Sequence, residues 1–97
     1  MVYHIVLLTF RPGYEEQWQP LLKALEALRG KISGMTSLCG GPYDSPEGFN
    51  QGYTHGLLMT FADRASRNTY LTHPDHEKVK ADFLPLVEKA VAFDFAA

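Results

Sequence analysis

The sequence predicts a ferredoxin-like α+β fold, in which a subunit of β, α, β, β, α and β elements pairs with a second copy. Three observations predict it. Four segments have the apolar alternation of strands, and helical patterns separate them in the split βαβ order. The largest side chains fall on one side of these strands. The other side is also apolar, although no helix remains in the chain to cover it.

Composition limits the class of protein before any motif is considered. The chain has 97 residues, which fits one domain over residues 1–97, and a net charge of −2 without a basic patch, which argues against nucleic acid as a partner. No apolar run of about 18 residues predicts a membrane span. The amino-terminal residues lack the pattern of a signal peptide. The single cysteine, Cys39, excludes an internal disulfide and fits a cytoplasmic location.

The first half of the chain gives a strand, a helix and a weaker strand. Residues 2–10 are apolar on both sides and predict a covered strand that Arg-Pro-Gly at 11–13 ends. Apolar residues then recur at helical spacing: Trp18, Leu21, Leu22, Leu25, Leu28 and Ile32. Pro20 requires either that the regular helix begins near it or that a kink follows a short first turn. Gly30 and Gly34 bracket the end of this helix.

The middle of the chain predicts two strands joined by a long loop. Residues 35–41 form a weak strand, and residues 41–52 are rich in Gly, Pro, Asp, Ser and Asn, which is typical of a loop. Residues 52–61, GYTHGLLMTF, alternate as a strand.

The last third predicts two helices and a final strand. Asp63 is placed to cap a helix over residues 64–71. Pro74 suits the first turn of a second helix, which Pro85 ends. Residues 87–95 then alternate to the carboxyl terminus as the last strand.

The bulky rows of the strands are predicted to face the helices. They are Val2, His4, Val6, Leu8 and Phe10 in the first strand, Tyr53, His55, Leu57, Met59 and Phe61 in the third, and Val91, Phe93 and Phe95 in the last. The opposite rows, such as Tyr3, Ile5 and Leu7, are too apolar to be left in water. Identical patches pair across a two-fold axis, so we expect a homodimer through this face.

Histidines in an apolar row call for a reason, because burying an imidazole requires a partner. His4 and His55 lie on the helix-facing side of strands that this topology can place side by side. His76 can point toward the sheet from the second helix, and Tyr70 ends the helix before it. One apolar cavity would then hold several converging polar groups, the general form of a small-molecule site. A single core histidine is more often structural, with a ring nitrogen bonded to a carbonyl.

A metal site is the weaker interpretation of the same histidines. His73 and His76 are three residues apart, but His73 precedes a proline and is not expected to be helical. Catalytic zinc usually takes three ordered ligands. We therefore expect neither a metal nor a cofactor.

Four segments together resemble the stress-responsive A/B barrel family, called Dabb. They are HIVLLTF, GYTHGLLMTF, YLTHPDHEKV and AVAFDF, in this order, and the resemblance covers residues 2–95. It implies a dimeric α/β barrel of ferredoxin-like subunits. Within the family the chain is similar to polyketide cyclases of the olivetolic acid cyclase type, which close a linear polyketide by an intramolecular aldol condensation.

The resemblance also implies roles for individual residues. His76 would be the general base, Tyr70 would orient it or donate to the developing enolate, and His4 and His55 would hold the carbonyls of the substrate. Imidazole suits this chemistry because its pKa lies near neutral pH. The apolar residues expected to bind the substrate are Val6, Leu8, Tyr53, Leu57, Met59, Phe83 and Phe93.

Three functions remain open at this point. A cofactor-free acid–base enzyme, a cyclase or a hydroxynitrile lyase acting on a small-molecule carbonyl compound, requires His4, His55, Tyr70 and His76 to converge on one accessible pocket. A non-catalytic, stress-related or ligand-binding dimer would instead keep the histidines buried, paired and closed off from solvent. A metal-binding protein would lose stability with its metal.

Overall fold

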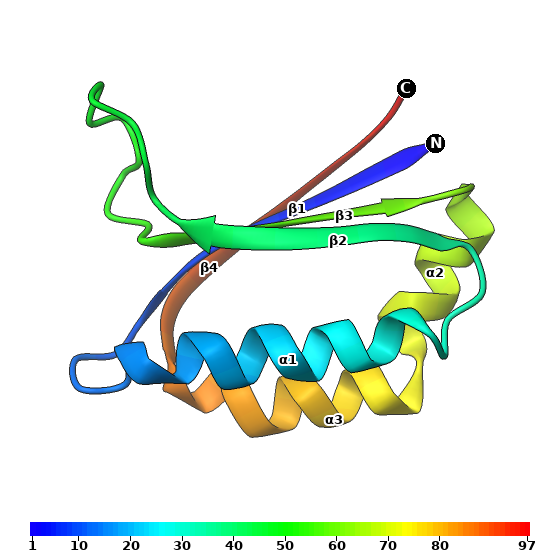
Figure 1. Ribbon diagram of the computed structural model, residues 1–97, viewed down its shortest axis with the longest axis horizontal. Coiled ribbons are helices and arrows are strands. Elements are labelled where there is room, and N and C mark those ends of the chain that lie inside the picture. The colour runs from blue at the N-terminus through cyan, green and yellow to red at the C-terminus, as the bar shows by residue number, and fades with distance from the viewer.

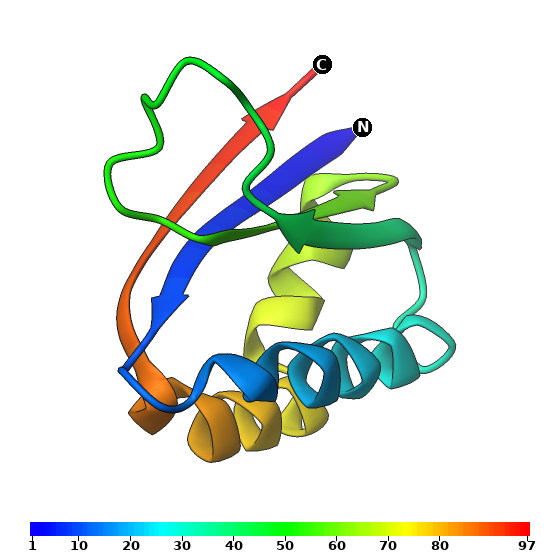
Figure 2. The same ribbon diagram turned by 60° about the vertical axis from the view of Figure 1, so that its left-hand side comes forward.

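The computed structural model describes residues 1–97 and has the ferredoxin-like α+β fold, with three helices on one face of a four-stranded antiparallel sheet (Figures 1 and 2). The elements are β1 (Val2–Phe10), α1 (Trp18–Arg29), β2 (Met35–Pro42), β3 (His55–Phe61), α2 (Arg64–Thr72), α3 (Pro74–Phe83) and β4 (Val87–Ala96), with short 3-10 turns at Glu15–Gln17 and Leu84–Leu86. The strand order is β2-β3-β1-β4. The two chain ends therefore leave the sheet side by side on β1 and β4 (Figure 2).

Pro20 lies in the first turn of α1, which begins at Trp18 directly after a 3-10 turn. The backbone N–H groups of a first turn have no partner within the helix, so a proline there removes no hydrogen bond. Of the two alternatives that the sequence left open, the regular helix therefore begins near Pro20 and has no kink after a short first turn. Ile32 lies beyond the end of the helix at Arg29 and is nevertheless buried.

The junction of α2 and α3 brings two site residues together. Asp63 accepts a hydrogen bond from the backbone N–H of Ser66 at 2.8 Å and caps α2. His73 is extended, as the residue before a proline should be, and its Nδ1 accepts from the backbone N–H of Asp75 at 3.1 Å. This break between two capped helices turns the chain so that Tyr70 and His76 pack ring against ring.

The register of the sheet confirms the inner rows of β1 and β3 but not that of β4. His4 pairs with Met59 of β3 and with Asp94 of β4, whereas Ile5 pairs with Phe93. Directly paired residues share a face of the sheet. The prediction that Val91, Phe93 and Phe95 face the helices is therefore wrong, and the inner row of β4 includes Ala90, Ala92 and Asp94.

Tyr53 also departs from the predicted inner row. β3 begins only at His55, so residues 52–54 belong to the loop that follows β2, and Tyr53 has no place in the strand. Lys89 holds the loop in this position. Its ammonium group lies 4.4 Å from the centre of the Tyr53 ring and donates to the carbonyl of Gln51 at 2.5 Å. Gly52 has a φ of 83°, which the turn requires and which glycine adopts without strain.

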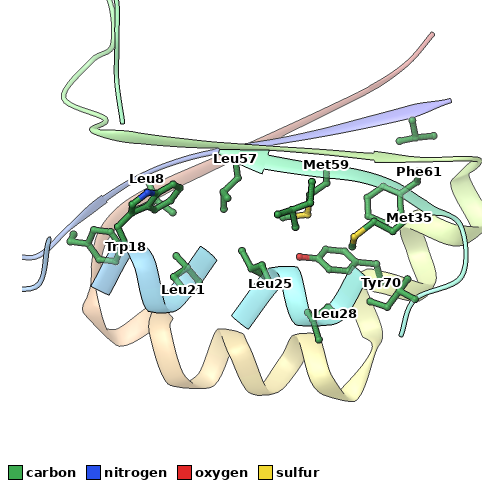
Figure 3. Packing of buried hydrophobic residues seen from close by; sticks show 14 residues of the cluster. Leu8, Trp18, Leu21, Leu25, Leu28, Met35, Leu57, Met59, Phe61 and Tyr70 are labelled. Atoms are coloured by element: carbon green, nitrogen blue, oxygen red, sulfur yellow. The ribbon is translucent and has the colours of Figure 1, made fainter. Parts of the chain in front are cut away.

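The core fills the space between the sheet and the helices (Figure 3). Its buried members are Val2, Leu8, Phe10, Trp18, Leu21, Leu25, Leu28, Ile32, Met35, Leu38, Leu57, Met59, Phe61 and Tyr70. On the opposite face of the sheet, the rings of Tyr3 and Phe95 stack at 4.9 Å and Phe93 is 66% exposed. This outer face, the row of Tyr3, Leu7, Val91, Phe93 and Phe95, is aromatic, apolar and uncovered by any helix (Figure 1).

Candidate active site

A cavity of about 110 Å³ lies between the inner face of the sheet and the helices. Its apolar lining includes five of the residues expected to bind substrate, namely Val6, Leu8, Leu57, Met59 and Phe83. His4, Tyr70 and His76 are the polar groups at one end, and Lys80 is the one charged residue of the lining. Phe93 lies on the other face of the sheet, and Tyr53 lines a different cavity.

Tyr70 is the centre of a polar cluster with His4 and His76. Its ring centre lies 6.1 Å from that of His4 and 4.1 Å from that of His76, so α2 places the phenol between an imidazole of β1 and an imidazole of α3. All three side chains are buried. The hydroxyl of Tyr70 points along the space between Met59 and Leu25, where the cavity lies (Figure 3).

His4 has a carboxylate partner that orients its ring. Its Nδ1 lies 2.6 Å from Oδ1 of Asp94, and the other carboxylate oxygen accepts a hydrogen bond from Arg67 at 2.6 Å. Burial acts to raise the pKa of Asp94, but the hydrogen bonds from His4 and Arg67, together with their charges, outweigh it and hold that pKa below its usual value. Asp94 is therefore ionised at neutral pH and can only accept, so Nδ1 of His4 carries the proton.

His76 is oriented by the backbone instead of by a charge. Its Nδ1 lies 3.3 Å from the carbonyl oxygen of Leu71, and a carbonyl can only accept. Burial is the main cause that lowers the pKa of His76; Lys80 and His4 lower it further, while the Leu71 carbonyl and Glu77 oppose the shift. The ring is therefore neutral at pH 7, with Nε2 unprotonated.

Burial raises the pKa of the Tyr70 hydroxyl far above its usual value. The side chain is 1% exposed, and a phenolate there would lose its hydration. Tyr70 thus keeps its proton and can donate a hydrogen bond to an oxygen that gains negative charge. The cluster combines one neutral donor, Tyr70, with two imidazoles whose Nδ1 atoms are each tied to an acceptor.

His55 does not join this cluster. It pairs with Leu8 on the inner face, four residues along β3 from Met59, which separates it from the cluster by about 13 Å. Its ring packs at 4.5 Å against Trp18 and edge-on against Phe10, and Nδ1 lies 2.9 Å from the hydroxyl of Thr54. Burial lowers the pKa of His55. Its surroundings are those of a structural histidine at the end of the core.

Comparison with known proteins identifies the family. The sequence model of the stress responsive A/B barrel domain, Dabb, matches residues 2–97. The chain belongs to the Dabb family. It is 30% identical over 95 residues to the stress-response A/B barrel domain-containing protein HS1 of Arabidopsis thaliana, a match that covers 97% of this chain and 87% of HS1.

Solved structures support the same fold. A dimeric ferredoxin-like protein of unknown function from Jannaschia sp. CCS1 superposes with a TM-score of 0.90 at 24% identity, covering 99% of this chain and 98% of that one. The hydroxynitrile lyase of Passiflora edulis superposes with a TM-score of 0.86 at 23% identity, covering 97% and 90%. At these identities both neighbours show the fold alone.

Sequence reasoning missed two residues that support this candidate site through His4, namely Asp94 and Arg67. The signal for Asp94 was present in AVAFDF, where one row holds Ala90, Ala92 and Asp94 and the other holds the bulky residues. Assigning the bulky row to the core placed Asp94 on the wrong face. Arg67 gave no signal of its own, because a polar helix position usually faces water.

Other features of the Dabb chain lie outside this cluster. A second cavity of about 380 Å³ lies between the end of the sheet and the loop after β2, where Tyr43, Phe49, Tyr53 and His55 line it. Nowhere do three His, Cys, Asp or Glu side chains come together in a way that could hold a metal ion. None of the helices is both long and apolar enough to cross a membrane.

Proposed function

We propose that this Dabb protein is a cofactor-free acid–base enzyme that acts on a small carbonyl compound. One observation carries the proposal. At the end of an apolar cavity, a protonated tyrosine lies between two histidines, each of which has its Nδ1 tied to an acceptor. Such a group of convergent polar side chains in an apolar pocket supplies a proton acceptor and a donor for developing charge without a metal.

The reaction class is an intramolecular aldol closure, as in the cyclases that the sequence resembles. A histidine Nε2 takes the acidic proton beside a carbonyl, and the enolate oxygen that forms accepts a hydrogen bond from Tyr70. The enolate carbon then bonds to a second carbonyl carbon of the same molecule. The new alkoxide takes back the proton from the imidazolium, so the histidine is regenerated. The resemblance gives the role of base to His76.

The volume of the cavity limits the part of a substrate that it can hold. About 110 Å³ is well below the 300–1,000 Å³ of pockets that enclose drug-sized ligands. Only the reacting end of a polyketide would fit among His4, Tyr70 and His76, and the rest would extend past Leu84, an exposed residue of the lining. We therefore propose a short substrate, or a longer one whose tail remains outside.

Cleavage of a cyanohydrin is the second candidate, and the small cavity favours it. The fold is shared with the Passiflora edulis hydroxynitrile lyase. A histidine would take the hydroxyl proton, the bond to the nitrile carbon would break, and cyanide would leave as the carbonyl forms. Both candidates need the same donor and acceptor, so the residues alone do not separate them. A substrate panel does.

We also propose that the protein acts as a homodimer through its outer face. That face holds Phe93, Phe95 and Tyr3 in one apolar row that no helix covers. A contiguous exposed apolar patch of this kind usually marks an interface. The Jannaschia neighbour is described as dimeric, which agrees with the pairing.

The test measures two reactions with the same protein. Short β-diketones, β-keto thioesters and simple ketones are incubated in deuterium oxide, and NMR follows exchange at the carbon beside the carbonyl. Small aliphatic and aromatic cyanohydrins are tested for release of the aldehyde. We expect catalysis of one of the two. Tyr70→Phe should slow it by about 10²–10³-fold, the usual effect of losing one donor to a developing oxyanion.

Tyr53→Phe is the matched control, because this tyrosine lines the other cavity. It should leave the rate unchanged. Equal rates for Tyr70→Phe and the parent protein, or no reaction with either panel, would contradict the proposal and favour a non-catalytic, ligand-binding dimer.

A further inference from the structure

The chain of Arg67, Asp94 and His4 is the best-defined polar arrangement in the protein. α2, β4 and β1 each contribute one residue, and both carboxylate oxygens are occupied, each at 2.6 Å. Arg67 and Asp94 are only partly exposed, and His4 is buried. Arg67 has donors and no acceptor, so it fixes the carboxylate in the state that accepts from both sides.

We propose that Arg67 and Asp94 hold His4 as the Nδ1–H tautomer and thereby make its Nε2 the base of the site. This assignment rests on the proposed function, and it differs from the role that the resemblance gives to His76. Arg67 and Asp94 act through His4, and they are positioning residues.

The surroundings of the two histidines support the assignment. When Nε2 of His4 takes a proton, the positive charge that forms lies against the carboxylate of Asp94, which stabilises it. His76 has no such partner: the groups around it are the Leu71 carbonyl, Lys80, Glu77 and the ring of Tyr70, and burial disfavours a charge on it. A base that becomes positively charged during the reaction needs a carboxylate beside it, and only His4 has one.

All ionisable groups near His4 fit this scheme. Asp94 faces it from β4 with Arg67 behind, Tyr70 faces it from α2, and His76 and Lys80 line the same cavity from α3. The substrate proton would pass to Nε2 of His4, the oxygen charge would be held by Tyr70, and the neutral His76 would pack on the tyrosine ring. The proton later returns from His4 to the product oxygen, so the step is balanced.

The Asp94→Asn variant tests the tautomer directly. Arg67 can only donate, so it keeps the amide oxygen of the new asparagine on its own side. The amide NH₂ then faces Nδ1 of His4, which must become an acceptor. We expect His4 to switch from the Nδ1–H to the Nε2–H tautomer, an outcome that imidazole nitrogen NMR distinguishes, with the His4→Gln spectrum assigning the signal.

The double variant isolates the part that Arg67 plays. With Arg67→Met in addition to Asp94→Asn, the asparagine is free to turn its oxygen toward His4, and the Nδ1–H tautomer should return. The matched control is Arg64→Met with Asp94→Asn. Arg64 lies in the same helix and lines the same outer cavity near Asp94, but forms no ion pair with it. This control should keep the switched tautomer.

Rates on a substrate found with the panel give a second measurement. Asp94→Asn should lower turnover by about 10⁴-fold, because the wrong tautomer presents N–H in place of a base. Arg64→Met should leave it unchanged.

His4 in the Nε2–H form in the parent protein, or an Asp94→Asn variant that keeps the Nδ1–H form, would overturn the assignment. The spectra decide this with or without turnover. If the parent protein shows the expected tautomers but catalyses nothing, the proposed function fails and the positioning by Arg67 stands.

Discussion

The two faces of the sheet use apolar residues for different purposes. On the inner face, Phe61 is 0% exposed and packs in a core that continues into the helices. On the outer face, Phe93 is 66% exposed, and its ring lies 6.5 Å from that of Phe95, which stacks on Tyr3. Both faces are apolar, yet only the inner one is completed within a single chain.

The difference is sharpest in β4. Beside β1 its inner row is small, with Ala90, Ala92 and the polar Asp94, whereas its outer row is large. Small inner residues leave space beside His4 for the cavity, and Ala90 itself lines it. The large outer residues suit an interface. The size of a side chain therefore does not show which face of this sheet is the core.

The largest effect is expected on the inner face. Phe61→Ala should lower the free energy of unfolding by about 3–5 kcal/mol, because it removes a fully buried ring and leaves a cavity. Urea unfolding measures this loss. Phe49→Ala is the control, since that phenylalanine is 77% exposed on the loop and should change little. Similar losses for both variants would mean that the inner face is not the core.

On the outer face, the same kind of residue should govern association. Phe93→Asp puts a charge in the centre of the proposed interface and should weaken dimerisation by about 2 kcal/mol or more, roughly 30-fold in Kd. Sedimentation velocity over a range of concentrations measures this. Leu84→Asp changes an exposed leucine away from this face and should leave the dimer intact. A parent protein that stays monomeric at high concentration would refute the interface.

Sequence patterns predicted the order of elements because each boundary has a local cause. Asp63 caps α2, Pro74 starts α3, and His73 is extended because a proline follows it. In β1 and β3, alternation also identified the inner row, because the bulky residues of one strand pair directly with the bulky residues of the other. β4 failed because the choice of face depends on pairing with β1, a contact of long sequence separation that no local pattern contains.

The sequence likewise predicted only part of the candidate site. His4, Tyr70 and His76 come together as their positions in the expected topology suggested. His55 lies on the same face of the sheet as His4 but too far along β3 to reach the cluster. This distance depends on the residue at which each strand begins. Asp94 was missed because the wrong face was assigned to β4, and Arg67 was missed because a polar helix position usually faces water. What the sequence lacks in each case is the register of the sheet.

Two adjacent glycines in β2 allow the two faces of the sheet to be compared by adding one methyl group to each face. A Cβ on Gly40 would lie 2.7 Å from the carbonyl oxygen of Gly56 and 2.9 Å from a methyl of Leu57, whereas a Cβ on Gly41 would meet nothing within 4 Å. Gly40→Ala should therefore cost about 1–3 kcal/mol through overpacking. Gly41→Ala should cost less than about 0.5 kcal/mol. Thermal unfolding of the two variants gives the comparison, and equal melting temperatures would show that β2 is not packed tightly on its inner side.

The smallest effect concerns the pH dependence of stability, to which His76 and His55 contribute. Burial lowers the pKa of His76 in the folded protein, so below its ordinary pKa the unfolded chain binds a proton that the folded chain resists. Stability should fall as the pH drops through this window, and His55 adds a change of the same sign. Asp94 does not interfere, because its lowered pKa places its own loss of stability at more acidic pH.

His76→Gln removes the titrating group and should flatten the fall in unfolding free energy between about pH 7.5 and 5.5, the range around the ordinary histidine pKa. His55→Gln should flatten it less, because His55 is the more exposed of the two. Chemical denaturation at several pH values measures the slopes. An unchanged slope in His76→Gln would mean that His76 already takes up its proton in the folded state as readily as in the unfolded chain. In that case the conclusion that His76 is a neutral ring packed on Tyr70 would be wrong. The difference from His4 on which the choice of base depends would be lost.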